Sequence, residues 1–167
     1  MMLQFLTWLE NTSFAMWLVQ SDTIWAYPTV LTLHTVGLAL LVGASAAVDL
    51  RLLGFGRKLP VAALINAFPI MWAGFWINAI SGAMLFAGDA TTKGTTTIFQ
   101  VKLGLIALGV INILMIKRVV FGRGPGLLRG FRLEAEAPVL WPAKLLAVSS
   151  LAVWMTAIAL GRFMAYV

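Results

Sequence analysis

Residues 27–54 read YPTVLTLHTVGLALLVGASAAVDLRLLG, and His34 is the only acidic or basic side chain in this stretch before Asp49. A run of about 20 apolar residues is long enough to cross a hydrocarbon core roughly 30 Å thick. The bilayer interior offers the backbone no water, so a single crossing segment must satisfy its own hydrogen bonds as a helix. The stretch therefore predicts a membrane-spanning helix over about residues 24–50.

Three further apolar runs of similar length follow, at about 62–87, 96–121 and 138–166. Across the 167 residues, 61% are hydrophobic and 11% are charged, and the mean hydropathy is +0.95. Soluble domains contain about 25% charged residues. We therefore predict an all-α integral membrane four-helix bundle that forms a single domain over residues 1–167, and a water-soluble fold is excluded.

The N-terminal residues 1–20, MMLQFLTWLENTSFAMWLVQ, are apolar but are interrupted by four polar residues at 10–13. They lack the basic start that is typical of a signal peptide. Tryptophans commonly anchor a helix at the membrane interface, and this segment carries Trp8 and Trp17. We expect an interfacial helix, or two short ones, rather than a fifth span.

Basic residues cluster in two of the connections between the spans. The connection at 51–60 carries Arg51, Arg57 and Lys58. The connection at 117–137 carries Lys117, Arg118, Arg123, Arg129 and Arg132. Loops rich in Lys and Arg stay in the cytoplasm, so this pattern predicts a protein of the bacterial inner membrane with both termini in the periplasm. The net charge of +6 is then a topology signal, and we expect no nucleic-acid partner.

Three ionisable side chains fall inside the predicted spans, and such residues are functional candidates by default. His34, the only histidine, lies about ten residues into the first span, which places it roughly 15 Å from the outer end and near the bilayer centre. Gly37 and Gly82 are expected to make room beside it for another helix or a flat cofactor. The alternative is a neutral histidine that hydrogen-bonds a neighbouring carbonyl or hydroxyl.

Lys102 and Arg162 are the other two ionisable candidates, and both belong to the outer half of the predicted bundle. Two cations without an acidic side chain at matching depth favour an anionic partner, such as the propionates of a haem. The alternative for each is snorkelling to the lipid headgroups, which is easier for Arg162 than for the deeper Lys102.

The single histidine and the absence of cysteine exclude zinc and di-iron sites in a monomer, because these need several protein ligands. A haem is compatible, because the macrocycle itself supplies four ligands. Four methionines in the spans are either thioether ligands for haem iron or filler of the apolar core: Met71, Met84, Met115 and Met155. Near the inner end, Asp49 is expected to form a structural ion pair with Lys144 or Arg51.

The stretch 27–54 combines a Tyr-Pro start, a Leu-His-x-x-Gly core and an Asp-Leu-Arg-Leu-Leu-Gly end. In these features it resembles the first span of a family of short bacterial four-helix membrane proteins. The early histidine together with the later Lys102 is also distantly similar to HemJ-type protoporphyrinogen oxidases and to CopD-type copper-resistance membrane domains. The HemJ-type resemblance implies a b-type haem with His34 as its axial ligand and Lys102 in the porphyrin pocket.

These patterns lead to one main functional hypothesis and two alternatives. The main hypothesis is a haem-b-binding membrane protein that acts in electron transfer or porphyrin oxidation, with His34 on the iron and Lys102 and Arg162 near the propionates. The sixth iron position would be open, or filled by a methionine or by His34 of a second protomer in a homo-oligomer. The first alternative is a non-catalytic structural or anchor subunit of a larger membrane complex that binds lipid, pigment or a partner helix. The second is a small transporter or channel.

Overall fold

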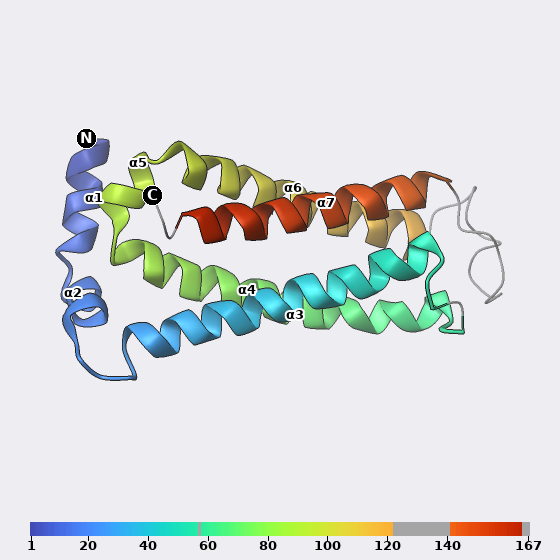
Figure 1. Ribbon diagram of the computed structural model, residues 1–167, viewed down its shortest axis with the longest axis horizontal. Coiled ribbons are helices and arrows are strands. Elements are labelled where there is room, and N and C mark those ends of the chain that lie inside the picture. Colours follow the sequence, from blue (N-terminus) through green and yellow to red (C-terminus); the bar gives the residue numbers. More distant parts are fainter. Residues whose placement is uncertain (57, 122–140, 165–167) are drawn as a thin grey trace.

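The computed structural model describes residues 1–56, 58–121 and 141–164, and within these ranges every regular element is a helix. Four long helices run side by side along the long axis of the molecule (Figure 1): α3 (Tyr27–Leu53), α4 (Ala67–Ala87), α6 (Thr97–Phe121) and α7 (Trp141–Phe163). Each of them is long and apolar enough to cross a membrane. The prediction of an all-α bundle with four apolar long helices is therefore confirmed.

The first span begins later than the sequence pattern suggested. Helix α3 starts at Tyr27, with Pro28 in the first turn, where the missing N–H of a proline costs nothing. Its N-cap is Ala26, which provides no side-chain cap. The helix ends at Leu53, and Gly54 follows in the left-handed conformation with φ of 106°, which strongly favours glycine. The span is therefore displaced by three residues from the expected 24–50.

The other spans lie close to their expected positions. A 3-10 helix, η1 (Val61–Asn66), precedes α4, and the apolar segment that could cross the membrane is Ala63–Ala87. Helix α6 starts one residue after the expected position 96 and ends at Phe121. Helix α7 is described from Trp141 to Phe163, and residues 138–140 and 165–166 of the expected span lie outside the described residues. So do Arg57, Arg123, Arg129 and Arg132, on which the predicted orientation partly depends.

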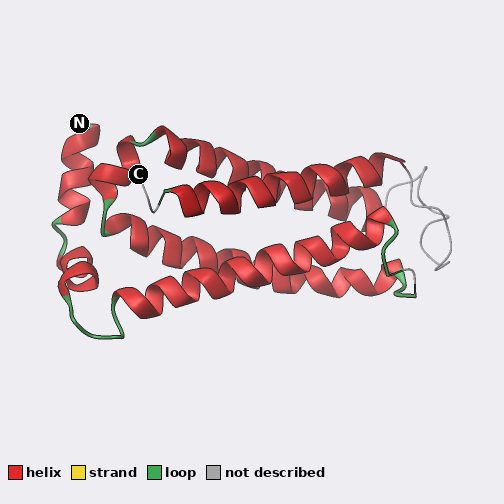
Figure 2. Cartoon of the chain, in the orientation of Figure 1, coloured by secondary structure: helices red, strands yellow, loops and turns green. Residues whose placement is uncertain are grey.

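The N-terminal segment forms two short helices rather than one, α1 (Met2–Glu10) and α2 (Ser13–Gln20). Thr12 caps α2 by accepting a hydrogen bond from the Ala15 N–H at 3.3 Å. Together with α5 (Ala90–Thr95), these helices lie across one end of the bundle (Figure 2). The Glu10 carboxylate accepts hydrogen bonds of 2.8 Å from both the Thr91 N–H and the Thr91 hydroxyl, which ties α1 to α5.

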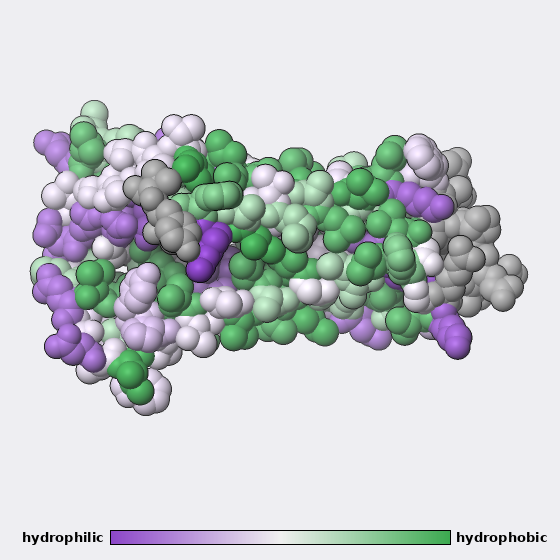
Figure 3. All heavy atoms as spheres, in the orientation of Figure 1, coloured by the Kyte–Doolittle hydropathy of each residue, from purple (hydrophilic) through white to green (hydrophobic). Residues whose placement is uncertain are grey.

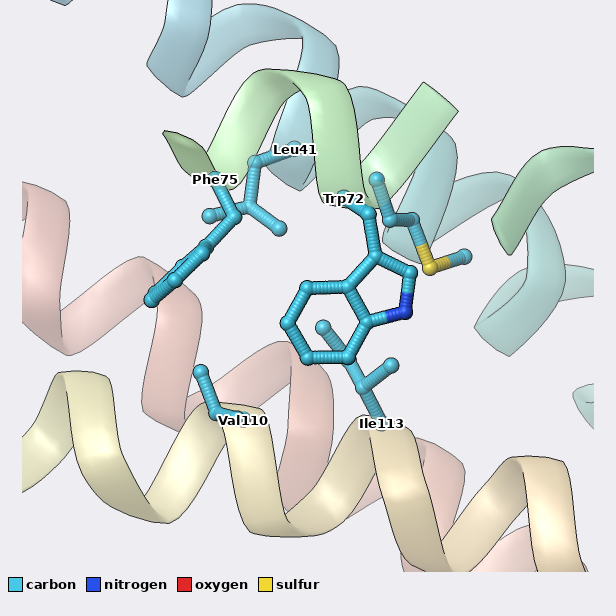
Figure 4. Close-up of a pocket in the computed structure, with 6 residues that line it drawn as sticks. Leu41, Trp72, Phe75, Val110 and Ile113 are labelled. Carbon is cyan, nitrogen blue, oxygen red and sulfur yellow. The ribbon is translucent and has the colours of Figure 1, made fainter. Parts of the chain in front are cut away.

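Helix α3 is the central element of the bundle, because it packs against both α4 and α7, while α6 packs against α7. Helices α4 and α6 face each other across a narrow apolar gap (Figure 4). There Trp72 and Phe75 of α4 point towards Val110 and Ile113 of α6. The cavity between them is about 10 Å³, which is close to the minimum for a single water molecule.

The surface of the molecule divides into zones along the long axis. On the face that Figure 3 shows, apolar side chains cover the middle of the bundle and hydrophilic side chains lie at both ends. Large apolar side chains such as Trp76, Ile80, Leu103 and Met155 are exposed on the long helices. Contiguous exposure of this extent is unusual in soluble proteins. The fold is therefore that of a multi-pass membrane protein whose apolar band meets a lipid bilayer.

Candidate functional site

The site is built on an unusually close approach of α3 and α4 at two glycines. A Cβ atom added to Gly37 would lie 2.6 Å from the backbone nitrogen of Asn78 and 2.9 Å from the carbonyl oxygen of Gly74. A Cβ atom added to Gly74 would lie 2.8 Å from the carbonyl oxygen of Gly37. The two backbones are therefore in direct contact, as is common where small residues line a membrane helix interface.

His34 lies one turn from this contact, towards the end of the bundle that carries α1 and α2. Its Nδ1 atom is 3.0 Å from the carbonyl oxygen of Asn78 and 3.2 Å from the hydroxyl oxygen of Ser81. The half-buried imidazole lies on Gly82, where an added Cβ atom would be only 2.9 Å from Cε1. Asn78 returns a hydrogen bond of 2.8 Å from its side-chain amide to the backbone carbonyl of His34.

These contacts determine which imidazole nitrogen carries the proton. The Asn78 carbonyl can only accept, so the Nδ1 atom must donate. The Ser81 hydroxyl already donates to the Ile77 carbonyl at 2.6 Å, so it too acts as an acceptor towards Nδ1. In the neutral ring Nε2 is then the atom with the lone pair. The side-chain nitrogen of Asn78 lies 3.5 Å from it, at the outer limit of a hydrogen bond.

Lys102 is the second ionisable residue that the structure brings to this site. Its ammonium group crosses from α6 to α7, where it lies 3.3 Å from the Cβ position of Gly161. Its positive charge is close enough to act electrostatically on His34. Among the described residues Lys102 forms no ion pair with a carboxylate, whereas Lys93 pairs with Asp89 at 3.4 Å. The half of the bundle nearest to α1, α2 and α5 therefore holds the His34 imidazole and the Lys102 ammonium group.

The other residues that the sequence predicted for this site are Gly37, Gly82 and Arg162. Gly37 faces the backbone of α4, and Gly82 faces the imidazole itself, so the space that each glycine opens is filled by protein. Arg162 is exposed on the last turn of α7, next to Gly161. His34 is seven residues from the start of α3, or roughly 10 Å along the helix. It therefore lies nearer to the outer end than the expected 15 Å.

Three of the four methionines that were considered as iron ligands lie elsewhere in the described structure. Met71 lines the gap between α4 and α6, and Met115 and Met155 are exposed on the apolar surface. No group of three or more His, Cys, Asp or Glu side chains comes together within the described ranges. A metal centre at this site would therefore depend on His34 and on a ligand that brings its own donor atoms.

The expected ion pair of Asp49 is wrong. The Asp49 side chain is 0% exposed, and its Oδ2 atom accepts a 3.4 Å hydrogen bond from the Ser45 hydroxyl. Arg51 instead donates from Nε to the Leu59 carbonyl at 2.7 Å, and Lys144 forms no ion pair with Asp49. The physical reason is the helix periodicity: Asp49 continues the inward-facing row of α3, in steps of four residues from Gly37.

Three residues of these sites, Gly74, Ser45 and Ser150, were not predicted from the sequence. A usable signal existed for the first, because Gly74, Asn78 and Gly82 follow one another at intervals of four and so share a face of α4. Ser150 had no such signal, since α7 contains several small residues and only the tertiary packing selects one of them. It is completely buried, 3.4 Å from the Ser45 hydroxyl.

The fold and its polar contacts define a multi-pass helical membrane protein in which a histidine of the first span hydrogen-bonds the second span. No protein-family model, curated protein or solved structure matches the chain. The function is therefore argued from the geometry of the site.

Proposed function

We propose that the chain is a haem-b-binding protein of the bacterial inner membrane that acts in electron transfer or porphyrin oxidation, with His34 as the axial ligand. The observation that carries this proposal is the hydrogen bond between His34 Nδ1 and the Asn78 carbonyl. A metal-binding histidine commonly donates its second N–H to a carbonyl, which fixes the tautomer and the ring orientation. The lone pair of Nε2 is then directed away from that bond.

The polar contacts of His34 and the charge of Lys102 support such a group, whereas the space at Gly37 and Gly82 is already filled by protein. Ser81 and Gly82 hold the imidazole from the α4 side, and Asn78 holds the backbone of α3. Lys102 supplies a positive charge that has no carboxylate partner in the described structure, and a propionate would provide that partner. The bound haem would supply one-electron chemistry, because its iron changes oxidation state while the macrocycle keeps four ligands in place.

The orientation in the membrane is part of the same proposal. Arg51, Lys58, Lys117 and Arg118 lie near the end of the bundle that is opposite to α1, α2 and α5. Under the positive-inside rule this end faces the cytoplasm, and both termini lie in the periplasm. His34 and Lys102 then belong to the periplasmic half of the protein, where an electron or porphyrin would be exchanged.

The absorption spectrum of the purified protein tests the proposal. We expect a Soret band in the wild-type protein and its loss in His34→Ala. Ser81→Ala is the matched control, because it removes one polar contact of Nδ1 but leaves the Asn78 carbonyl in place, so this variant should keep the band. A wild-type protein without a Soret band after expression with adequate haem, or an unchanged band in His34→Ala, would overturn the proposal.

A second candidate, a non-catalytic structural or anchor subunit of a larger membrane complex, is favoured by one specific observation. In the described structure every hydrogen bond of the His34 side chain goes to α4. The histidine would then serve only to join the first two spans. In this case the chain should comigrate with a larger assembly in detergent-solubilised native membranes, and His34→Ala should lower stability without any spectral change.

A further inference from the structure

A second polar cluster lies inside the other half of the bundle, between α3 and α7. Asp49 and Ser150 are 0% exposed and Ser45 is 2% exposed. Asp49 precedes the end of α3 at Leu53 by four residues, which is about 6 Å along the helix. The cluster is therefore buried from lipid and from water, yet it lies close to the inner end of the bundle.

The hydrogen bonds of this carboxyl group are few and long. Asp49 Oδ2 lies 3.4 Å from the Ser45 hydroxyl, which is in turn 3.4 Å from the Ser150 hydroxyl. The Oδ1 atom is buried and has no hydrogen-bond partner. An ionised carboxylate has acceptor capacity for about four hydrogen bonds, so most of that capacity is unused here.

Among the residues that the structure describes, no charged side chain on the neighbouring elements pairs with Asp49. On α3 itself, Arg51 is directed to the Leu59 carbonyl. On α6, Lys117 lies over the ring of Phe68, with its Nζ atom 5.7 Å from the ring centroid. On α7, Lys144 makes no ion pair with Asp49. The polar contact of the carboxyl group is with the Ser45 hydroxyl, which in turn contacts the Ser150 hydroxyl.

A charged carboxylate in such surroundings would be costly, because neither a cation nor a full set of donors replaces the lost water. A protonated carboxyl group avoids that cost, and its O–H can donate to the oxygen of Ser45. We propose that Asp49 is an intramembrane proton-binding site, which holds a proton in the packed bundle and releases it when water or a cation reaches Oδ1.

The step involves only a proton. Asp49 exchanges between the neutral carboxylic acid and the carboxylate plus one released proton, and no electron or co-reactant takes part. Because the cluster lies near the inner end of α3, the proton exchanges with the cytoplasmic side under the proposed orientation. Asp49 lies 15 residues from His34 on the same helix, so this proton site does not depend on a haem at His34.

Infrared difference spectroscopy of the protein in lipid vesicles tests the site at neutral pH. We expect a carbonyl band of a protonated carboxyl group that is lost in Asp49→Asn and shifts in frequency in Ser150→Ala. Glu10→Gln is the matched control and should leave the band unchanged, because Glu10 is already bound by Thr91 at the surface. The absence of a protonated band that depends on Asp49 would overturn the proposal, as would a carboxylate band that responds to sodium ions instead.

A measurement on the wild-type protein guards against a variant that does not fold. The chain contains three aspartates, Asp22, Asp49 and Asp89, so carboxyl-¹³C aspartate gives three signals in solid-state NMR. We expect one of the three to remain protonated at neutral pH while the other two are ionised. If all three signals move together in the acid range, Asp49 is an ordinary carboxylate and the proposal is wrong.

Discussion

At the scale of single residues, a backbone carbonyl determines the chemistry of the only histidine. The Asn78 carbonyl can bind Nδ1 because α3 and α4 touch at Gly37 and Gly74, which brings the next turn of α4 within 3.0 Å of the ring. Any substitution that moves the ring relative to this carbonyl should therefore change both the tautomer and the ligand capacity of His34.

Gly82→Ala provides a residue-scale prediction. The added methyl group would lie 2.9 Å from Cε1 and 3.3 Å from Nδ1 of His34, so we expect the ring to be displaced and the free energy of unfolding to fall by about 1–3 kcal/mol, as is typical of overpacking. The measurement is unfolding in detergent, followed by circular dichroism. Gly104→Ala is the control, because no atom lies within 4 Å of its Cβ position. Equal stabilities of the two variants would contradict this packing.

The sequence singled out His34 and Lys102 as candidates at this scale, because ionisable residues are conspicuous inside apolar spans. The sequence did not predict the partner of His34, because every residue has a backbone carbonyl and the residue type does not show which one is used. It also misassigned Asp49, because proximity to Arg51 along the chain suggested an ion pair. Residues two apart on a helix point in different directions, and the inward row of α3 separates the two side chains.

At the scale of elements, the contact between α3 and α4 is a backbone contact, and its stability depends on the absence of side chains. Gly37→Ala would place a methyl group 2.6 Å from the Asn78 nitrogen. The helices would have to separate, because neither backbone can rotate away as a side chain can. We expect a loss of about 1–3 kcal/mol in the free energy of unfolding, measured by the same detergent assay.

Gly43→Ala on the same helix is the matched control for this prediction. Its Cβ position is open, with nothing within 4 Å. In water-based scales, replacing a glycine in a helix by alanine gains roughly 1 kcal/mol, so this variant should be as stable as the wild-type protein or more stable. A destabilised Gly43→Ala together with a neutral Gly37→Ala would contradict the packing of α3 and α4.

The short helices at the outer end allow a second prediction at this scale. Glu10 is the residue that joins α1 to α5, through the Thr91 N–H and hydroxyl. Glu10→Ala should therefore release α1 and increase amide hydrogen exchange over residues 2–10. Thr7→Ala is the control, because the Thr7 hydroxyl bonds only to the Leu3 carbonyl of its own helix. Unchanged exchange in Glu10→Ala would show that other contacts hold α1.

The sequence predicted these elements closely, because each long helix coincides with an apolar run and glycine or proline lies near its ends. The start of α3 was less predictable. The helix begins at Tyr27, three residues after the expected start, and it has no side-chain cap. Tertiary packing rather than capping therefore fixes this end, since Ala26 and Val30 are both buried against the rest of the protein.

At the scale of the whole molecule, the apolar band and the distribution of basic residues make the orientation testable. The chain contains no cysteine, so a single introduced cysteine reports one position without background. Thr92→Cys at the outer end should react with an impermeant maleimide in intact spheroplasts. Lys58→Cys, exposed at the opposite end, should react only after the membrane is permeabilised. The reverse pattern would contradict the predicted orientation.

The bundle as a whole follows from the sequence, but the arrangement of its helices does not. Four apolar runs define four spans, but they do not predict that α3 takes the central position or that large apolar side chains line a narrow gap between α4 and α6. Both faces of a helix that contacts lipid are apolar, so the periodicity of its sequence does not show which face packs against the other helices.

The central claim is that His34 holds its proton on Nδ1 and presents the lone pair of Nε2 as a ligand. Because His34 is the only histidine, ¹⁵N labelling of histidine gives just two ring-nitrogen signals in solid-state NMR of the protein in lipid. In the haem-free protein we predict a protonated Nδ1 and an unprotonated Nε2 at neutral pH. A protonated Nε2 with an unprotonated Nδ1 would contradict the account.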